Sequence, residues 1–274
     1  MRIVITGGSG FLGRALTKFW RENHTVCVYS RSESAQAALE PHPNVRKFIG
    51  DVRDRDRLRR AFDGADAVIH AAALKRIEVG EYNPDEMVKT NVIGTMNVIE
   101  AAKDAGVERV VYTSTDKAWQ PISPYGQSKA LAESLILAAN NTVRRYEGPK
   151  FSVTRYGNVM GSTGSVIPVW RAAKAAGERG RITHPWATRF WMSIAEAVQC
   201  VERTLRCMQG GERIIPRLPS FRLGDLAEAM EIECDIIGLP AWEKAHEGMD
   251  DDNQSVHAPR LSVDEIRERL KELE

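Results

Sequence analysis

The first thirteen residues, MRIVITGGSGFLG, constrain the fold of this chain more than any other segment. A β-rich apolar run, Arg2–Thr6, leads into glycines at positions 7, 10 and 13, and a helical pattern starts at Phe11. Glycine permits a tight turn and lets a diphosphate approach the N-terminus of the following helix. A glycine triplet between a first strand and a first helix therefore predicts a dinucleotide site, whereas the triplet alone is a weak signal. The candidate cofactor contacts here are Gly7, Ser9, Gly10, Phe11, Leu12 and Gly13.

Short β-rich runs and helical patterns alternate through the first half of the chain. The expected strands are Arg2–Thr6, Thr25–Tyr29, Val45–Ile49, Ala67–His70, Arg109–Thr113 and Phe151–Tyr156. The expected helices are Phe11–Asn23, Arg55–Phe62, Pro84–Ala105 and Tyr125–Tyr146. Such alternation predicts an α/β fold, a doubly wound parallel sheet of the Rossmann type with helices on both faces.

The pattern loosens after about residue 157, where glycines and prolines separate short elements. Such punctuation is expected of a smaller lobe that closes over a substrate. We therefore predict a cofactor-binding domain at 1–157 and a smaller C-terminal substrate-binding lobe at 158–274, with a return of the chain to the main sheet near 214–215 left open. The final helix is expected from Ser262, because Ser262 and Glu265 form a capping signature.

Composition excludes several classes of protein. The 274 residues include 38 basic and 37 acidic side chains, a net charge of +1, which argues against a nucleic-acid or membrane-surface partner. No apolar run is long enough to span a bilayer, and the chain opens directly into a strand rather than into a signal peptide. The four cysteines lack metal-ligand spacing. These features predict a cytoplasmic protein with reduced thiols and no metal.

The end of the second expected strand indicates which nicotinamide cofactor fits. An acidic residue there usually binds the ribose hydroxyls of NAD. This chain has Ser30 and Arg31 instead, and a hydroxyl with a guanidinium suits a 2′-phosphate, which favours NADP. The alternative is that Arg31 is only a solvated surface charge.

Two further strand ends supply candidate cofactor contacts. Asp51, followed by Val52, ends the third strand and either accepts a hydrogen bond from the adenine amine or caps the next helix. The fourth strand ends at His70, which we expect to be a structural histidine rather than a catalyst. The small residues that follow it leave room for the cofactor backbone, and the candidates there are Ala71, Ala72 and Ala73.

The segment STDKAWQPISPYGQSK, residues 114 to 129, carries the candidate chemistry. Tyr125 and Lys129 are one helical turn apart, so they share a face, and a nearby ammonium lowers the pKa of a phenol. Such a phenol can take the proton of a sugar hydroxyl while a hydride leaves the same carbon. Asp116 and Lys117 add a second acid and base that simple alcohol oxidation does not need. The alternative is that Asp116 caps a turn and Lys117 is solvated.

These motifs resemble the extended short-chain dehydrogenase/reductase superfamily. Closer still, HAAALKRIEVGEYNPDEMVKTNVIGTMNVIEAA, STDKAWQPISPYGQSK, RYGNVMGSTGSVIP and TRFWM are similar to the UDP-N-acetylglucosamine 4,6-dehydratases of nucleotide-sugar biosynthesis, most of all to the soluble inverting type of the pseudaminic acid pathway. The likeness runs from residue 1 to about 200 and then thins. The chain departs from the family pattern at His184, at Ala187 and at Leu239–Trp242.

The resemblance implies a lyase that oxidises carbon 4, removes water across carbons 5 and 6, and returns the hydride to carbon 6. In that scheme Tyr125, Lys129 and Thr115 serve the oxidation, while Asp116 in its acid form and Lys117, a desolvated lysine poised to lose its proton, serve the elimination. Inversion at carbon 5 follows if Lys117 reprotonates it from the opposite face. Asn91 is implied as a further cofactor contact.

Substrate contacts are expected beyond the sixth strand. The candidates are Lys75, Tyr156, Asn158, Ser165 and Arg189, with Arg189 as a clamp for the diphosphate. Phe190 or Trp191 offers apolar packing, or else these two rings belong to the core of the lobe, and Arg189 forms an ion pair.

Two other functions remain open from the sequence. A UDP-sugar 4-epimerase or reductase uses the same tyrosine, lysine and cofactor, but leaves carbon 6 untouched and does not need Asp116 and Lys117. A non-catalytic NADP-sensing module typically lacks the tyrosine–lysine pair, which is intact here. The resemblance also implies a homo-oligomer, because long helices often pair between protomers in this superfamily.

Overall fold

A seven-stranded parallel sheet forms the centre of the protein in the computed structural model, which describes residues 1–142 and 148–273. Its order is β3-β2-β1-β4-β5-β6-β9. The strands are β1 (Arg2–Thr6), β2 (Thr25–Ser30), β3 (Val45–Ile49), β4 (Ala67–His70), β5 (Arg109–Thr115), β6 (Lys150–Tyr156) and β9 (Arg213–Ile214). The reversal of order beside β1 confirms the predicted doubly wound Rossmann sheet.

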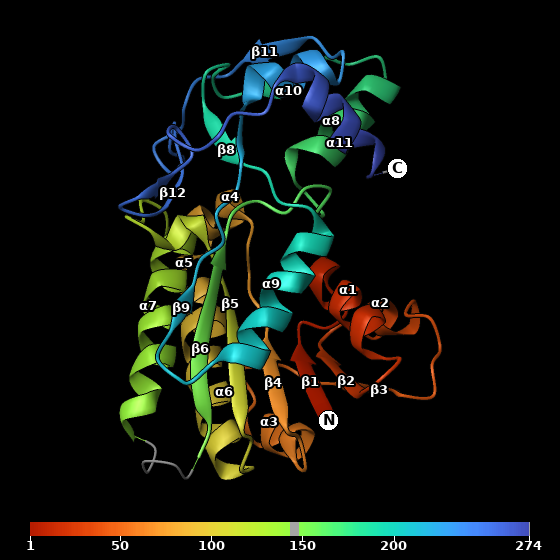
Figure 1. The fold of residues 1–274 in the computed structure, drawn as a ribbon, viewed down its shortest axis with the longest axis vertical. Helices are drawn as coiled ribbons and strands as arrows, with labels where there is room; N and C mark the ends of the chain where they lie inside the picture. The colour runs from red at the N-terminus through yellow and green to blue at the C-terminus, as the bar shows by residue number, and fades with distance from the viewer. Residues whose placement is uncertain (143–147, 274) are drawn as a thin grey trace.

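Alternate residues of β1 face the two opposite sides of the sheet. Val4 points into a core made with α3 (Arg55–Phe62), α6 (Gly94–Asp104) and α7 (Pro124–Ala139). Ile3 and Ile5 point into a second core, made with α1 (Phe11–Trp20) and α9 (Ile194–Cys207). Helices therefore cover both faces of the sheet (Figure 1), as strands that are apolar on both faces require.

Several expected helices differ in detail from the observed ones. The stretch expected as one helix at Pro84–Ala105 is divided into α5 (Pro84–Met87), a π-helix at Val88–Ile93, and α6. The expected Tyr125–Tyr146 helix ends at Ala139, and its last four positions lie outside the described residues. In the first half of the chain the pattern missed two short helices, α2 (Glu33–Ala37) and α4 (Ile77–Tyr82), which are too short to show a helical period. Between residue 157 and Ser262 it predicted no helix, although α9 and two shorter helices lie there.

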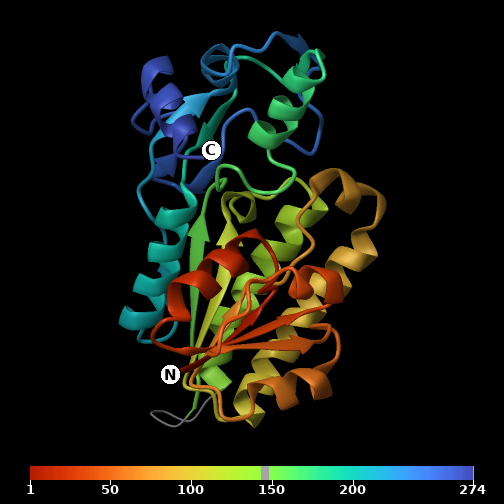
Figure 2. The same cartoon turned by 90° about the vertical axis from the view of Figure 1, so that its right-hand side faces the viewer.

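The C-terminal part lies over the carboxyl ends of the sheet strands (Figures 1 and 2). Its own core gathers around Trp170, Trp191 and Phe221. Three two-stranded sheets pair β8 with β10, β7 with β11, and β12 with β13. The elements are α8 (Val166–Ala175), β7 (Gly180–Ile182), β8 (Thr188–Phe190), β10 (Ser220–Arg222), α10 (Leu223–Ala229), β11 (Cys234–Ile236), β12 (Gly248–Asp250), β13 (Asn253–Gln254) and α11 (Val263–Lys271).

The chain returns from this upper part to the sheet once. After β8 it descends through α9, which packs against α1, and then through β9, which pairs with β6 at Val153 and Thr154. The chain then runs back to the C-terminal part, where β10 pairs with β8. At the end of the chain the predicted capping box is present, since Ser262 and Glu265 bond reciprocally at the start of α11.

No helix in the described ranges is both long and apolar enough to cross a membrane. Within the same ranges, no group of three or more His, Cys, Asp or Glu side chains is arranged to hold a metal ion.

Candidate functional site

The glycine turn after β1 forms a close-packed cradle at the N-terminus of α1. Gly7 has φ of +70°, and a Cβ there would lie 2.8 Å from the backbone nitrogen of Ala72. A Cβ on Gly13 would lie 2.5 Å from the carbonyl oxygen of Gly7. No side chain of the described residues caps α1 at Gly10, so its first N–H groups are left for an anion. Ser9, Phe11 and Leu12 belong to the same turn.

At the end of β2, Ser30 is buried and Arg31 is exposed. The Ser30 hydroxyl is buried and accepts a hydrogen bond from Gln36 Nε2 at 2.9 Å. The Arg31 side chain is 53% exposed, with Nη1 at 3.8 Å from Asp51 Oδ2. Arg31 is therefore the more exposed of the two, with its guanidinium in a long ion pair with Asp51, whereas the Ser30 hydroxyl is buried.

Asp51 does not cap the helix that follows it. The N-cap of α3 is Asp54, whose carboxylate accepts from Arg57 N at 2.9 Å. The Asp51 carboxylate instead accepts from the backbone and guanidinium of Arg53. Burial opposes ionisation of Asp51, but these bonds and the nearby Arg31 bring its pKa below the usual value.

The end of β4 holds His70 in a structural role. Its Nδ1 lies 2.7 Å from Thr6 Oγ1, and its Nε2 lies 3.0 Å from Thr95 Oγ1. Burial lowers the pKa of His70 to about 3, and Lys129 adds to the effect, so the ring is neutral. The half-buried residues Ala71, Ala72 and Ala73 follow directly.

Two residues expected to contact the cofactor, Val52 and Asn91, have side chains that make contacts within the protein. Val52 is buried in the core on the α6 side, where a Cβ on Gly94 would lie 2.7 Å from its Cγ2. Asn91 lies in the π-helix, and its amide donates to Leu74 O at 3.0 Å and to Ser128 Oγ at 3.0 Å. The Asn91 side chain therefore fixes the loop after β4 against α7.

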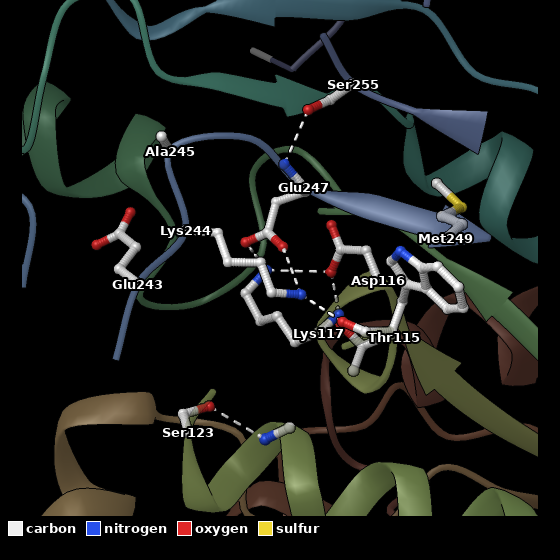
Figure 3. A network of polar contacts seen from close by, with 12 residues as sticks. Thr115, Asp116, Lys117, Ser123, Glu243, Lys244, Ala245, Glu247, Met249 and Ser255 are labelled. Atoms are coloured by element: carbon white, nitrogen blue, oxygen red, sulfur yellow. Dashed lines mark hydrogen bonds and ion pairs between the residues drawn. The ribbon is translucent and has the colours of Figure 1, made fainter. Parts of the chain in front are cut away.

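A network of acids and bases begins where β5 ends (Figure 3). Asp116 is fully buried, and its Oδ1 accepts from Thr115 Oγ1 at 2.8 Å and from Lys117 Nζ at 3.1 Å. Lys117 Nζ also donates to Asn158 Oδ1 at 3.1 Å. The structure thus brings four of the predicted site residues into direct contact: Thr115, Asp116, Lys117 and Asn158.

Glu247, from the C-terminal part, completes this network, and sequence reasoning missed it. Its Oε1 lies 3.4 Å from Lys117 Nζ, and its side chain is 2% exposed. Lys244 comes from the same segment and donates to the Trp119 carbonyl. Position 247 is separated from Lys117 by 130 residues, and only the burial of a carboxylate beside a lysine singles it out.

The electrostatics correct one prediction about Lys117. Burial raises the pKa of Asp116, and the Glu247 carboxylate raises it further, which favours the acid form. Burial alone lowers the pKa of Lys117, but Asp116 and Glu247 outweigh it and raise that pKa above its usual value. The prediction of a lysine poised to lose its proton is therefore wrong for this arrangement: Lys117 is held as an ammonium.

Tyr125 and Lys129 both lie buried on α7, as expected from their spacing. Lys129 Nζ donates to Thr113 O at 2.7 Å and lies 4.0 Å from the centre of the Tyr112 ring. Burial lowers the pKa of Lys129 to about 7. Burial also raises the pKa of Tyr125 to about 12, and the lysine that opposes this rise is Lys117. The predicted lowering of the phenol pKa by Lys129 is thus wrong for this arrangement.

The substrate candidates are scattered around this network. Lys75 is exposed and Ser165 is half-buried at the start of α8. Tyr156 is buried in the core of the α9 side, and burial raises its phenol pKa. Of these candidates, only Asn158 contacts the acid–base network directly.

Arg189 has a different role from the predicted diphosphate clamp. It is buried, donates to Thr188 O at 2.8 Å and Ala245 O at 3.0 Å, and pairs with Glu243. These contacts commit its guanidinium to holding the segment that carries Glu247. Phe190 and Trp191 are fully buried, so both rings belong to the core.

Comparisons with known proteins agree with this geometry. Residues 3–265 match the family described as "Polysaccharide biosynthesis protein". The chain is 43% identical over 256 residues to a "UDP-N-acetylglucosamine 4,6-dehydratase (inverting)" of Campylobacter jejuni, which covers 90% of this chain and 76% of the relative. It is 37% identical over 245 residues to a "UDP-glucose 4-epimerase" of Rickettsia canadensis, covering 86% of this chain and 71% of the relative.

Solved structures show the same fold. The X-ray structure of Pen from Bacillus thuringiensis superposes with a TM-score of 0.94 at 31% identity and covers 99% of this chain and 97% of that one. DesIV, a dTDP-glucose 4,6-dehydratase from Streptomyces venezuelae solved with NAD bound, superposes with a TM-score of 0.84 at 22% identity, covering 99% of this chain and 96% of that one.

Proposed function

The chain belongs to the polysaccharide biosynthesis protein family, and from this premise we propose that it converts UDP-N-acetylglucosamine to a UDP-4-keto-6-deoxy-N-acetylhexosamine with inversion at carbon 5. The observation that carries the proposal is the buried Asp116–Lys117 pair at the end of β5, with 3.1 Å between Oδ1 and Nζ. The carboxyl ends of parallel strands are where such sheets place their sites. A second acid and base beside the Tyr125–Lys129 helix suits elimination of water, which epimerisation does not require.

A nicotinamide dinucleotide fits the glycine turn, because, within the residues that the structure describes, the start of α1 has no side-chain cap at Gly10 and its first N–H groups can bind a diphosphate. Gly7 and Gly13 let the turn pack closely against neighbouring backbone, where a Cβ would clash. When bound, the dinucleotide supplies a reversible acceptor for the hydride of carbon 4. We propose NADP rather than NAD, since the Arg31 guanidinium is half exposed beside this turn and suits a 2′-phosphate.

Different residues of the chain serve the oxidation and the elimination. Tyr125, as the phenolate that the nearby Lys117 cation favours, takes the proton of the carbon-4 hydroxyl. Thr115 hydrogen-bonds the same hydroxyl, and Lys129 would contact the nicotinamide ribose. The ketone formed acidifies the proton on carbon 5. Asp116, whose raised pKa favours its acid form, protonates the leaving carbon-6 hydroxyl. Lys117 serves carbon 5, and inversion follows if the proton returns on the opposite face.

The decisive experiment is incubation of the purified protein with UDP-N-acetylglucosamine in heavy water, followed by NMR of the product. We expect loss of one water, deuterium at carbon 5 and inverted configuration there. Asp116→Asn should slow dehydration by about 100-fold or more, in the range that general acid catalysis contributes. Undiminished formation of the 4-keto-6-deoxy product by the double variant Asp116→Ala, Lys117→Ala contradicts the proposal.

The epimerase reading has one supporting observation, the identity to UDP-glucose 4-epimerases. Product mass separates the two, because epimerisation leaves the mass of the sugar nucleotide unchanged. NADP binding without turnover of any UDP-sugar supports the third reading, a sensing module.

We also propose that the protein acts as a homo-oligomer in the cytoplasm. The four cysteines are free, in keeping with a reducing compartment. Apolar side chains exposed along the region from α4 to α7 offer a surface for a second copy of the chain: Val79, Tyr82, Val88, Ile93, Met96 and Leu131.

A further inference from the structure

Glu247 is held in place by the C-terminal part rather than by the sheet. Its backbone nitrogen donates to Ser255 Oγ at 2.9 Å, and its carbonyl accepts from Ser255 N at 2.7 Å. Ser255 Oγ in turn lies 2.7 Å from Thr188 Oγ1. Figure 3 shows the Glu247 side chain extending from this anchor toward Lys117. A buried carboxylate fixed at both backbone groups has a defined direction, which surface glutamates lack.

The second oxygens of two carboxylates have no hydrogen-bond partner in the described part of the chain. These are Glu247 Oε2 and Asp116 Oδ2, both buried. Buried polar atoms are nearly always paired, because an unpaired one costs free energy of folding. Both orphan oxygens belong to groups that contact Lys117 Nζ, through Asp116 Oδ1 at 3.1 Å and Glu247 Oε1 at 3.4 Å. Glu247 Oε2 also lies 4.0 Å from Lys244 Nζ, an ion pair but not a hydrogen bond, so the clearest place for a reacting group is Asp116 Oδ2.

The charges around the cluster favour different protonation states in Glu247, Lys117 and Asp116. Glu247 faces the cations Lys117, Arg189 and Lys244, which together lower its carboxyl pKa although burial opposes this. Lys117 faces the carboxylates Asp116 and Glu247, the cation Arg189, and the phenol of Tyr125. The neighbouring cations thus favour the ionised form of Glu247, whereas burial favours the acid form of Asp116.

We propose that Glu247 is a positioning residue for the dehydration step, which holds Lys117 beside Asp116 and keeps it as an ammonium. The inference rests on the proposed function. As an ammonium, Lys117 can return a proton to carbon 5: one N–H bond of Lys117 breaks and one C–H bond forms, with no change in oxidation state. Asp116 keeps the proton that the leaving hydroxyl needs.

The first test measures the Lys117 amine without substrate. Competitive labelling with acetic anhydride across a pH series, read by mass spectrometry of the peptide, gives the pKa of Lys117. Removing a neighbouring anion stabilises the neutral amine, so Glu247→Gln should lower that pKa by about 1 to 3 pH units. Glu247→Asp, which keeps the charge, should restore much of the difference. An unchanged Lys117 pKa in Glu247→Gln overturns the inference.

The second test separates elimination from oxidation. In single turnover with UDP-N-acetylglucosamine, Glu247→Gln should slow release of water by about 10- to 100-fold. Because Tyr125 and Lys129 are untouched, the near-ultraviolet absorbance of the reduced cofactor should rise normally and then persist. If oxidation and elimination slow equally, Glu247 has only a structural role and the inference fails.

Asp251→Asn is the control, since Asp251 is an exposed carboxylate of the same segment, in the turn between β12 and β13. It should leave the Lys117 pKa unshifted, and thermal unfolding of each variant checks the fold. If the wild-type protein releases no water from UDP-N-acetylglucosamine, the proposed function fails instead, and the labelling series still decides whether Glu247 controls the proton on Lys117.

Discussion

Arg31 is the residue through which cofactor choice can be tested most directly. Its guanidinium is half exposed at the end of β2, while the neighbouring Ser30 hydroxyl is bonded to Gln36. A charge-assisted hydrogen bond to phosphate contributes about 1.5 to 3 kcal/mol. Arg31→Gln should therefore weaken NADP binding by about 10- to 100-fold and leave NAD binding nearly unchanged, as measured by fluorescence titration. Equal weakening of both cofactors contradicts the NADP assignment, and Arg46→Gln, an exposed arginine on β3, is the control.

His70 links the stability of the fold to pH. Burial lowers its folded-state pKa to about 3, below the value of about 6.5 for an unfolded histidine. The unfolded chain therefore binds more protons as the pH falls, and stability present above pH 6.5 is lost progressively down to about pH 3. Between pH 6.5 and 4.5 the expected loss is about 2 kcal/mol. Urea unfolding should show a shallower acid loss in His70→Gln than in the wild type.

The exposed His257 provides the control for this measurement. His257→Gln should lose stability with falling pH as the wild type does. An acid profile that is identical in His70→Gln and the wild type contradicts the assignment of a neutral, buried His70.

At the scale of elements, α7 is seated directly on the turn that carries Asp116 and Lys117. A Cβ on Gly126 would lie 2.4 Å from the Lys117 carbonyl oxygen, a backbone atom that cannot move aside. Gly126→Ala should therefore push the start of α7, with Tyr125, away from the acid–base network. We expect a loss of about 1 to 3 kcal/mol in stability and a large fall in turnover, measured by urea unfolding and steady-state kinetics.

Gly80→Ala is the counterpart in α4. Its Cβ would approach Met87 Cε at 2.6 Å, the far end of a flexible side chain that can rotate away. Its effect on turnover should be small. If the two variants lose activity equally, close seating of α7 on the turn is not what positions Tyr125.

Local patterns predicted the strands β1 to β6 and the longer helices between them. Apolar strands, the glycine turn and the β5 segment have short-range signals, and β1 to β6 occur within a residue or two of their expected places. The division of the Pro84–Ala105 helix by a π-helix had no such signal, because Asn91 bonds to a loop that only the folded sheet brings near. The prediction for the protonation state of Lys117 failed for a similar reason: Asp116 is its neighbour in sequence, but Glu247 comes from a distant segment.

At the scale of the whole molecule, the exposed apolar surface predicts that two or more copies of the chain associate. The apolar side chains exposed from α4 to α7 lie on one region of the chain, and burying them against a second copy removes apolar surface from water. Light scattering after size exclusion should give a mass that is a multiple of 30.6 kDa. Met96→Glu with Leu131→Glu should shift the mass toward the monomer, whereas Ile236→Glu, exposed on β11, should not. A monomeric wild-type protein contradicts the proposal.

The return of the chain through α9 and β9 has a practical consequence for protein engineering. Because β9 completes the sheet between two visits to the upper part, that part is not a single cassette that can be exchanged between relatives. A chimera designed to change sugar selectivity must graft at least two separate stretches, before and after α9, and must leave the α1–α9 seam intact.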